Sequence, residues 1–330
     1  MSRAMVVTEP GVLRWADVPD PAPGPHDVVV RVRFTGLCGT DLHIVEGTHP
    51  RVRFPIALGH ELVGVPEAGE LSGQRVLVDP LLPCGACRAC QAGASNACKE
   101  LRLIGIDRHG GLAGRVAVSA DRLHPVPDGI PEELVPLAEP LAVAVHAVRK
   151  LPSLIGRTVV VVGGGTVGLL VAHLADLSGG SVLVMELAPA RRRIAARLGY
   201  ELLDAADPVG HLLARTSAQL ADFAVDAAAT PSVAALLCSL VGPMSSIAVI
   251  GAYGNLAAVD LQAVMFKELT VLGSRTYLPT DLDAALTLLN EGQSKLGLLL
   301  SGVVNAEAVA ATIQSLKAGE GMKYVVECPV

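Results

Sequence analysis

The middle of the chain alternates short aliphatic runs with longer apolar segments of helical length. Residues 158–162 and 181–185 are runs of mostly β-branched or aliphatic residues, as in strands buried on both faces of a sheet. Further strands are predicted over residues 224–227, 246–251 and 269–273. Helices between them are predicted over residues 169–177, 209–216, 232–240 and 261–267. This alternation predicts an α/β fold with a doubly wound parallel sheet.

The first part of the chain has a different pattern. Residues 28–34 end in an apolar-polar alternation, and prolines and a glycine within 21–25 interrupt the chain before them. No long helical period appears before about residue 132, and residues 131–150 then read as helical. Many short strands with glycine and proline turns are typical of a small β-barrel. The tail predicts helices over 281–290 and 306–316 and a final strand over 323–326.

Composition narrows the class of protein. A chain of 330 residues suggests two domains, and a net charge of −6 argues against a nucleic-acid-binding surface. No apolar run approaches the ~18 residues that span a membrane. The N-terminus lacks a charged leader before an apolar segment. The seven cysteines fall mostly in metal-type contexts, which indicates a reducing, cytoplasmic location; Cys238 and Cys328 read as core thiols.

The strand at 158–162 leads directly into Gly163-Gly164-Gly165-Thr166-Val167-Gly168, and an acid, Glu186, follows the second strand. The motif G-x-G-x-x-G alone is a weak signal, but strand, glycines, helix, strand and acid together form the dinucleotide-binding fingerprint. The helix N-terminus would receive the pyrophosphate. Glu186 would bind the ribose 2′-OH, which predicts NAD rather than NADP. Arg191 is expected near the ribose or adenine, and the nicotinamide near Gly251 and Ser274.

Two groups of metal-binding side chains lie in the first part of the chain. Cys84-x2-Cys87-x2-Cys90-x7-Cys98 places four thiols in a glycine- and alanine-rich loop, which suits a closed, structural zinc site. Upstream, Cys38, His60 and Glu61 offer a thiol, an imidazole and a carboxylate, the ligands of a borderline-soft ion such as zinc. Three protein ligands with one open position are the catalytic arrangement. A single buried cysteine is more often a core thiol, and a single His-Glu pair more often lies on the protein surface. Together, Cys38, His60 and Glu61 favour a metal site.

The stretch Cys38-Gly39-Thr40-Asp41-Leu42-His43 and the triplet Gly59-His60-Glu61 resemble the catalytic-zinc segment of the zinc-dependent medium-chain alcohol and polyol dehydrogenases. The resemblance covers nearly the whole chain. It implies a chaperonin-10-like β-barrel domain over 1–148 and 278–330, with the zinc lobe at 84–98, and a Rossmann domain over 149–277. It also implies hydride transfer between an alcohol and NAD, two zinc ions per chain, and a homodimer or homotetramer.

The resemblance also assigns a proton path beside the catalytic metal. Thr40 lies two positions after the ligand Cys38 and is expected to accept the proton of the alcohol. His43 lies five positions after Cys38 and is expected to carry that proton to solvent. Asp41 fits the carboxylate that orients a metal-bound histidine.

Glu139 resembles the acid that distinguishes polyol, threonine and butanediol dehydrogenases from simple alcohol dehydrogenases. This branch acts on secondary alcohols with neighbouring polar groups, so the resemblance predicts that Glu139 contacts zinc or substrate. Whether Glu61 or Glu139 ligates the metal at rest is left open by the sequence. Arg275 and Tyr277 lie where polyol enzymes hold substrate hydroxyls, although Thr276 separates them.

One segment differs from the family in length. Residues 65–76 are shorter than in the family and include Pro66, which cannot donate a ladder hydrogen bond; nothing in the sequence explains this.

Two alternative functions remain open. One alternative is a zinc-free enone or quinone reductase of the same fold, and the presence of Cys38, His60 and the four-cysteine cluster argues against it. The other is a non-enzymatic binding protein that retained the fold. The substrate is left open among polyols, cyclitols, sugars, diols and amino alcohols.

Overall fold

The structure, a computed structural model, describes residues 2–329 and divides the chain into two compact units. One unit runs to Pro140 and resumes at Leu278; the other is Leu141–Tyr277. The first unit is therefore discontinuous in sequence. Its first segment ends inside helix α3 (Ala138–Arg149), earlier than residue 148, where the resemblance ends that domain.

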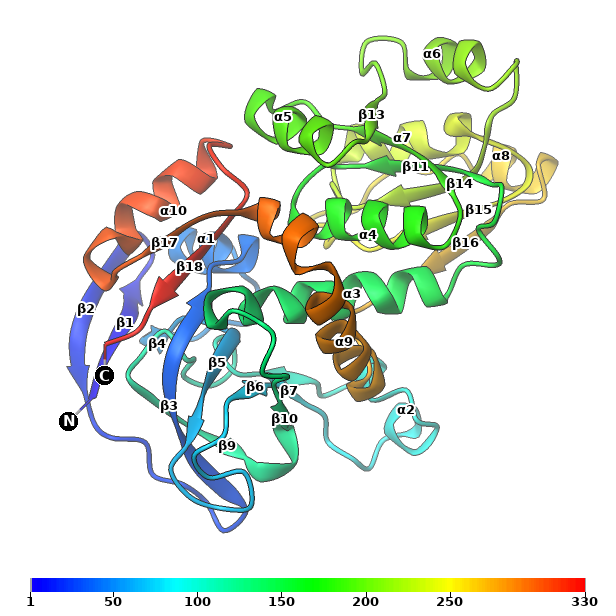
Figure 1. Cartoon of the computed structure of the whole chain (residues 1–330). Coiled ribbons are helices and arrows are strands. Elements are labelled where there is room, and N and C mark those ends of the chain that lie inside the picture. The colour runs from blue at the N-terminus through cyan, green and yellow to red at the C-terminus, as the bar shows by residue number, and fades with distance from the viewer. Residues whose placement is uncertain (1, 330) are drawn as a thin grey trace. The chain divides into compact units, whose positions relative to one another are not determined.

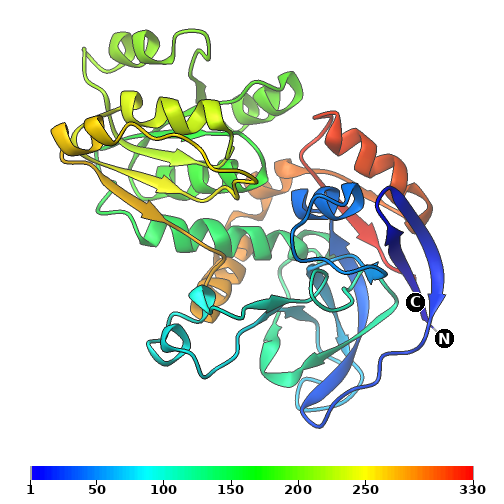
Figure 2. The same cartoon turned by 180° about the vertical axis from the view of Figure 1, so that it is seen from behind.

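The second unit is a parallel sheet with helices on both faces (Figures 1 and 2). Its strand order is β13 (Glu201–Leu202), β12 (Ser181–Met185), β11 (Thr158–Val162), β14 (Ala221–Asp226), β15 (Val241–Val249) and β16 (Thr270–Gly273). Its helices are α4 (Thr166–Leu177), α5 (Pro189–Arg197), α6 (Pro208–Arg215), α7 (Pro231–Leu240) and α8 (Leu261–Phe266). Every neighbouring pair of strands is parallel. The doubly wound fold predicted from the hydrophobic pattern is confirmed.

The local sequence explains these elements. The valines of β11 are almost completely buried, because strands β12 and β14 flank β11 and helices cover the faces of the sheet. Prolines occupy the first helical positions of α5, α6 and α7, where a missing N–H costs nothing. The strand order reverses between β11 and β14, and this is the point at which such sheets bind nucleotides.

The first unit is built mainly of short strands (Figure 1). Its largest sheet has the order β10 (Leu123–Pro125), β6 (Val76–Val78), β5 (Glu61–Pro66), β3 (Asp27–Gly36), β18 (Lys323–Glu327) and β17 (Leu300–Val304), with β9 (Arg115–Ser119) also on β3. The smaller sheets are β2 (Val12–Val18), β1 (Ser2–Glu9) and β4 (Ile56–Ala57), and β7 (Leu81–Leu82) with β8 (Arg102–Leu103). The final strand β18 thus pairs with β3 from the start of the chain.

The helices of the first unit, and the helix α3 that continues into the second, are partly as expected. The stretch 131–150 divides into the 3-10 helix η3 (Glu132–Leu137) and α3, and the tail forms α9 (Pro279–Leu296) and α10 (Val309–Lys317). Two short helices, α1 (Gly39–Glu46) and α2 (Arg88–Gln91), were not predicted, because neither is long enough to show a clear helical period. Within the described residues, every helix is too short or too polar to cross a membrane.

Candidate active site

The start of helix α1 orients the first candidate ligand. Cys38 is the N-cap residue, in an extended conformation, and its N–H donates to Oδ2 of Asp41 at 2.9 Å. This satisfies a backbone donor that a helix start leaves without a partner. The thiol of Cys38 lies 3.7 Å from the hydroxyl oxygen of Thr40. The helix start therefore holds the thiol, the hydroxyl and a fully buried carboxylate together.

The first residue of strand β5 and the residue before it are the other two candidate ligands. Gly59 has a φ of +97°, and a Cβ there would lie 2.6 Å from the backbone nitrogen of Leu112, so this turn requires glycine. His60 and Glu61 follow it directly, and both are buried. One ligand atom each from Cys38, His60 and Glu61 lies within 4.8 Å of the others. The structure thus brings together three residues that the sequence assigned to a catalytic zinc.

The charges around His60 suit a cation. Burial lowers the pKa of His60, but the charge of Cys38, and then those of Asp41 and Glu139, raise it well above its ordinary value. Nδ1 of His60 lies 4.0 Å from Oδ1 of Asp41, and among the described residues neither atom has a hydrogen-bond partner. A small movement would join the two atoms, as expected for a carboxylate that orients a metal-bound imidazole. The donor set of a thiol, an imidazole and a carboxylate therefore fits zinc.

Sequence reasoning missed a lysine at this cluster. Nζ of Lys323, on β18, lies 2.5 Å from Oε1 of Glu61, contacts its Oε2 as well, and donates to the carbonyl of Leu37 at 3.0 Å. Burial lowers the pKa of Lys323, but Glu61 raises it, and the net shift is upward. Gly36 makes room for the pair, since a Cβ there would lie 2.0 Å from Oε2 of Glu61. The available signal was that Lys323 lies on the same side of β18 as the buried Val325.

Two other predicted residues lie near the cluster but outside it. Glu139, in the first turn of α3, is 7% exposed, and its charge acts on both His60 and Lys323. It is not part of the group whose ligand atoms lie within 4.8 Å of one another. His43 is exposed on α1, with Nδ1 3.3 Å from the hydroxyl of Thr48.

The four-cysteine lobe is assembled as the spacing predicts. Ligand atoms of Cys84, Cys87, Cys90 and Cys98 all lie within 4.8 Å of one another. Sulfurs bound to zinc at about 2.3 Å are roughly 3.8 Å apart in a tetrahedron. The N–H of Cys90, then that of Lys99, lowers the pKa of Cys87 to about 6, which favours the thiolate that zinc needs. The N–H of Cys84 similarly donates to Sγ of Cys98 at 3.3 Å. This lobe fits a structural zinc.

The glycine turn between β11 and α4 has the geometry of a dinucleotide site. Gly163 has a φ of +103°, and a Cβ on Gly168 would lie 1.8 Å from the carbonyl oxygen of Gly163. Gly165 is the N-cap of α4, and Thr166 and Val167 open the helix. The turn is therefore close-packed in a way that only glycines allow, with the N–H groups at the helix start available for phosphate.

Glu186 follows β12 and is tied to this turn. One carboxylate oxygen accepts the N–H of Gly164 at 2.9 Å, and the other accepts those of Leu187 and Ala188 at 2.7 and 2.8 Å. Three backbone N–H groups thus fix the position of this carboxylate. Arg191 lies on α5, and among the described residues its buried Nε has no hydrogen-bond partner. Glu186 thus shapes the phosphate turn as well as the expected ribose site.

The remaining predicted residues follow the last strands of the sheet. Gly251 comes after β15, and Ser274 after β16, with its N–H donating to the carbonyl of Val249 at 2.9 Å. Among described residues the buried hydroxyl of Ser274 has no partner. Arg275 is exposed and Tyr277 is completely buried, so of these two only Arg275 presents much of its side chain at the surface of the chain.

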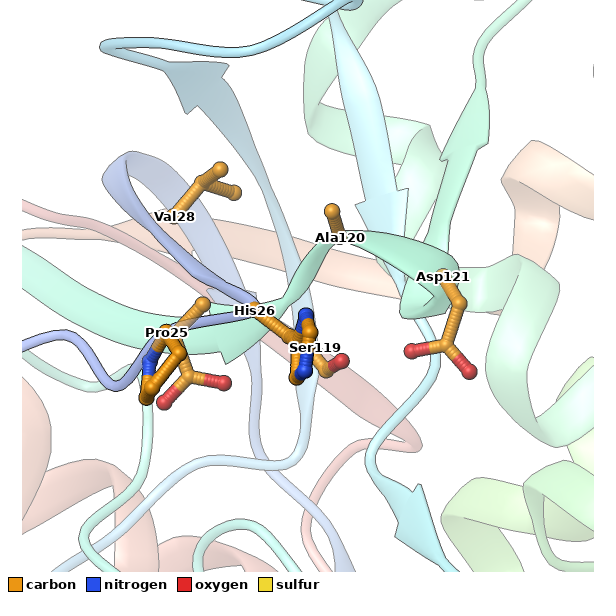
Figure 3. Close-up of a pocket in the computed structure, with 7 residues that line it drawn as sticks. Pro25, His26, Val28, Ser119, Ala120 and Asp121 are labelled. Carbon is orange, nitrogen blue, oxygen red and sulfur yellow. The ribbon is translucent and has the colours of Figure 1, made fainter.

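A surface depression of about 600 Å³ lies elsewhere on the first unit (Figure 3). It is lined by Pro25, His26, Asp27, Val28, Ser119, Ala120 and Asp121. None of these residues belongs to the metal clusters or the glycine turn. The candidate active site is therefore defined by its ligand atoms, not by this depression.

Comparison with known proteins agrees with this geometry. Residues 24–128 match the model of the alcohol dehydrogenase GroES-like domain, and residues 166–291 match that of the zinc-binding dehydrogenases. The chain belongs to the zinc-dependent medium-chain alcohol and polyol dehydrogenase family. The predicted combination of a chaperonin-10-like β domain and a Rossmann domain is confirmed, and the family's cofactors are zinc and a nicotinamide dinucleotide.

Several individual relatives are named as dehydrogenases. The 2-dehydro-3-deoxy-L-galactonate 5-dehydrogenase of Pseudoalteromonas atlantica is 33% identical over 93% of both chains. The sorbitol dehydrogenase of Halalkalibacterium halodurans is 30% identical over 98% of both. A solved structure of a putative zinc-binding dehydrogenase from Sinorhizobium meliloti, bound to NADP, is 30% identical, with a TM-score of 0.91 over 99% of both chains.

Proposed function

We propose that this protein oxidises a secondary alcohol carrying neighbouring hydroxyl or other polar groups to the ketone, with transfer of hydride to NAD. The observation that carries the proposal is the grouping of Cys38, His60 and Glu61 within 4.8 Å, with Glu139 buried nearby. The relatives are named for a galactonate derivative and for sorbitol. Both names describe molecules with adjacent hydroxyl groups, so the same broad substrate class is proposed here.

Each residue of the cluster has its own role in the proposed reaction. Cys38, His60 and Glu61 would hold zinc, which when bound polarises an alcohol oxygen and favours its deprotonated form. Thr40, beside the Cys38 sulfur, accepts the alcohol proton, and His43 on the same helix delivers it to solvent. Lys323 balances the charge of Glu61, so that this carboxylate does not add its full charge to the metal site. Glu139 is placed to bind a second hydroxyl of the substrate.

NAD is proposed as the preferred cofactor. The carboxylate of Glu186 is held in place by three backbone N–H groups, and a 2′-phosphate beside it would bring two negative charges together. The values of kcat/KM for NAD and NADP measure this preference; a ratio in favour of NADP would contradict it. Because Glu186 also holds Gly164, the substitution Glu186→Gln is expected to weaken binding of both cofactors rather than to exchange one for the other.

A homodimer or homotetramer in the cytoplasm is also proposed. Strand β16 is the edge of the parallel sheet, and Val271 on it is 49% exposed. Exposed apolar side chains continue over the neighbouring helix α8, at Leu261, Met265 and Phe266. An open edge with an apolar patch suits pairing with a second copy. All seven cysteines are free thiols, which supports a reducing compartment.

The function is tested by following NADH formation with the zinc-loaded protein. The substrates are sugars, polyols, cyclitols, diols and amino alcohols, and Cys38→Ser is the matched control. Turnover of at least one class, lost in Cys38→Ser, is expected. Silence across the whole panel would favour a binding protein that retained the fold, and reduction of enones or quinones without zinc would favour the reductase alternative.

A further inference from the structure

The carboxyl group of Asp226 joins two loops at the carboxyl edge of the parallel sheet in the second unit. Asp226 is the last residue of β14 and is completely buried. Its Oδ1 accepts the N–H groups of Ala228 and Ala229, in the loop after β14, at 3.0 and 2.9 Å. Its Oδ2 accepts the O–H of Tyr253, in the segment 251–260 after β15, at 2.6 Å. One side chain therefore fixes the loops that follow two neighbouring strands.

The backbone brings the same two loops into contact. The carbonyl oxygen of Asp226 accepts the N–H groups of Ile250 and Gly251 at 2.9 and 3.0 Å. A Cβ on Gly251 would lie 2.7 Å from the Cβ of Ala229. Ala229 has a φ of +53°, which residues with a Cβ rarely adopt. Such a conformation persists only where its surroundings fix it, and it is frequent at ligand sites. The hydrogen bonds of Asp226 supply that constraint.

The loop after β14 also packs against the glycine turn. A Cβ on Gly163 would lie 2.9 Å from the backbone nitrogen of Ala228. The N–H of Ala227 donates to the carbonyl of Val162 at 2.9 Å, directly before this turn. The turn expected to receive the pyrophosphate and the segment that contains Tyr253 therefore both contact the same loop.

The order of the strands indicates which half of a dinucleotide these loops would meet. The glycine turn after β11 is the expected pyrophosphate site, and Glu186 after β12 is the expected site of the adenosine ribose. In the sheet, β12 and β14 lie on opposite sides of β11, and β15 lies beyond β14. The other half of the dinucleotide, with the nicotinamide and its ribose, is then expected to extend over the loops after β14 and β15.

We propose that Asp226 and Tyr253 are positioning residues for the dinucleotide, and that the hydrogen bond between them holds the segment 251–254 where the nicotinamide half binds. The proposal rests on the proposed use of NAD, and it assigns neither residue a chemical step. Burial, and then the hydrogen bond to Asp226, raises the pKa of Tyr253, so its hydroxyl remains a donor. Removing that hydroxyl takes a partner from a buried carboxyl oxygen and frees the segment that it holds.

Tyr253→Phe tests the proposal, because it removes the hydroxyl and keeps the ring. Tyr200→Phe is the matched control. Tyr200 lies directly before β13, which is parallel to β12, and is therefore at the amino edge of the same sheet. Calorimetry on the zinc-loaded protein measures Kd for NADH and for ADP, which carries the adenosine and the pyrophosphate but lacks the nicotinamide and its ribose.

In Tyr253→Phe the Kd for NADH is expected to rise about tenfold, the loss of roughly one buried hydrogen bond. The Kd for ADP is expected to stay close to the wild-type value, which also shows that the variant is folded. In Tyr200→Phe both values should stay close to wild type. The ratio of the two Kd values is thus the quantity that the hydrogen bond between Asp226 and Tyr253 changes.

The melting temperature of the ligand-free protein separates positioning of the cofactor from general support of the fold. A lower melting temperature in Tyr253→Phe with an unchanged ratio of the two Kd values would overturn the proposal, as would equal weakening of NADH and ADP. Unchanged Kd values with NAD-dependent turnover intact would overturn the role of the pair and leave the dehydrogenase function standing. Selective loss of NADH binding in a protein that oxidises no alcohol would support the pair and count against the dehydrogenase.

Discussion

At the scale of single residues, a buried pair of opposite charges supports the candidate metal ligands, because Nζ of Lys323 contacts both carboxylate oxygens of Glu61. Cys38, His60 and Glu61 are residue types with recognisable metal chemistry at a recognisable spacing. Lys323 has no such mark, because its partner Glu61 is distant in sequence and meets it only when β18 pairs with β3. Gly36 makes room for that pair, but the sequence does not show that Gly36 lies against Glu61.

The pair of Glu61 and Lys323 gives a prediction that involves the metal. Lys323→Met leaves a buried carboxylate without its cation, and breaking such a pair typically costs about 3 kcal/mol or more. We expect urea unfolding of the chelated protein to show a loss of this order. Zinc should reduce the loss, because the ion then compensates Glu61.

Lys317→Met is the control for this measurement, since Lys317 forms a largely exposed pair with Glu46 at 2.7 Å. Its effect is expected to stay below about 1 kcal/mol with or without zinc. Equal losses for Lys323→Met in the chelated and zinc-loaded proteins would mean that zinc does not compensate Glu61.

Glu139 gives a second prediction at this scale. It lies outside the group of closest ligand atoms, yet its charge reaches His60, as expected for a carboxylate that can bind either the metal or a substrate hydroxyl. Glu139→Gln should lower kcat/KM for vicinal diols and polyols about tenfold more than for mono-alcohols, because a charge-assisted hydrogen bond is lost. Glu133→Gln, on the neighbouring 3-10 helix, is the control. Equal losses on both substrate classes would limit Glu139 to tuning the metal.

At the scale of elements, buried parallel strands were the most predictable. The predictions for residues 158–162 and 181–185 coincide with β11 and β12, because a short aliphatic run between turns is typical of a strand buried on both faces of a sheet. Strand β15 begins earlier than predicted, at Val241, through a glycine and a proline that do not read as strand. Strand β17 was not predicted, since it pairs only with β18 and lies at a sheet edge. Its formation depends on a partner that the local sequence does not show.

The cysteine lobe is the element whose metal should be structural. We expect Cys87→Ser to lower the melting temperature of the zinc-loaded protein and to remove one zinc per chain, because the metal supplies folding free energy to a lobe with little core of its own. Cys38→Ser should instead abolish turnover with little change in melting temperature. Calorimetry and metal analysis of the two variants make the comparison. Loss of turnover together with an unchanged melting temperature in Cys87→Ser would contradict a structural role.

At the scale of the whole molecule, the sequence indicated two units and a chain that returns to the first, and the structure divides the chain in that manner at Leu278. What pattern alone could not supply was the position of the first division, which falls within the continuous helix α3 rather than in a linker. The helical periodicity is continuous across this boundary and therefore does not indicate where one unit ends and the other begins.

Assembly is the last property that belongs to this scale. If two copies pair along β16, placing a charge at Val271 puts an uncompensated cation into an apolar contact, so Val271→Lys should convert the dimer or tetramer into a smaller species. Light scattering coupled to size exclusion measures the mass. Ile155→Lys is the control, because Ile155 is 78% exposed and lies outside the strands and helices; it should leave the mass unchanged. An unchanged mass in Val271→Lys would place the contact between copies elsewhere, and a wild-type monomer would exclude assembly through this edge altogether.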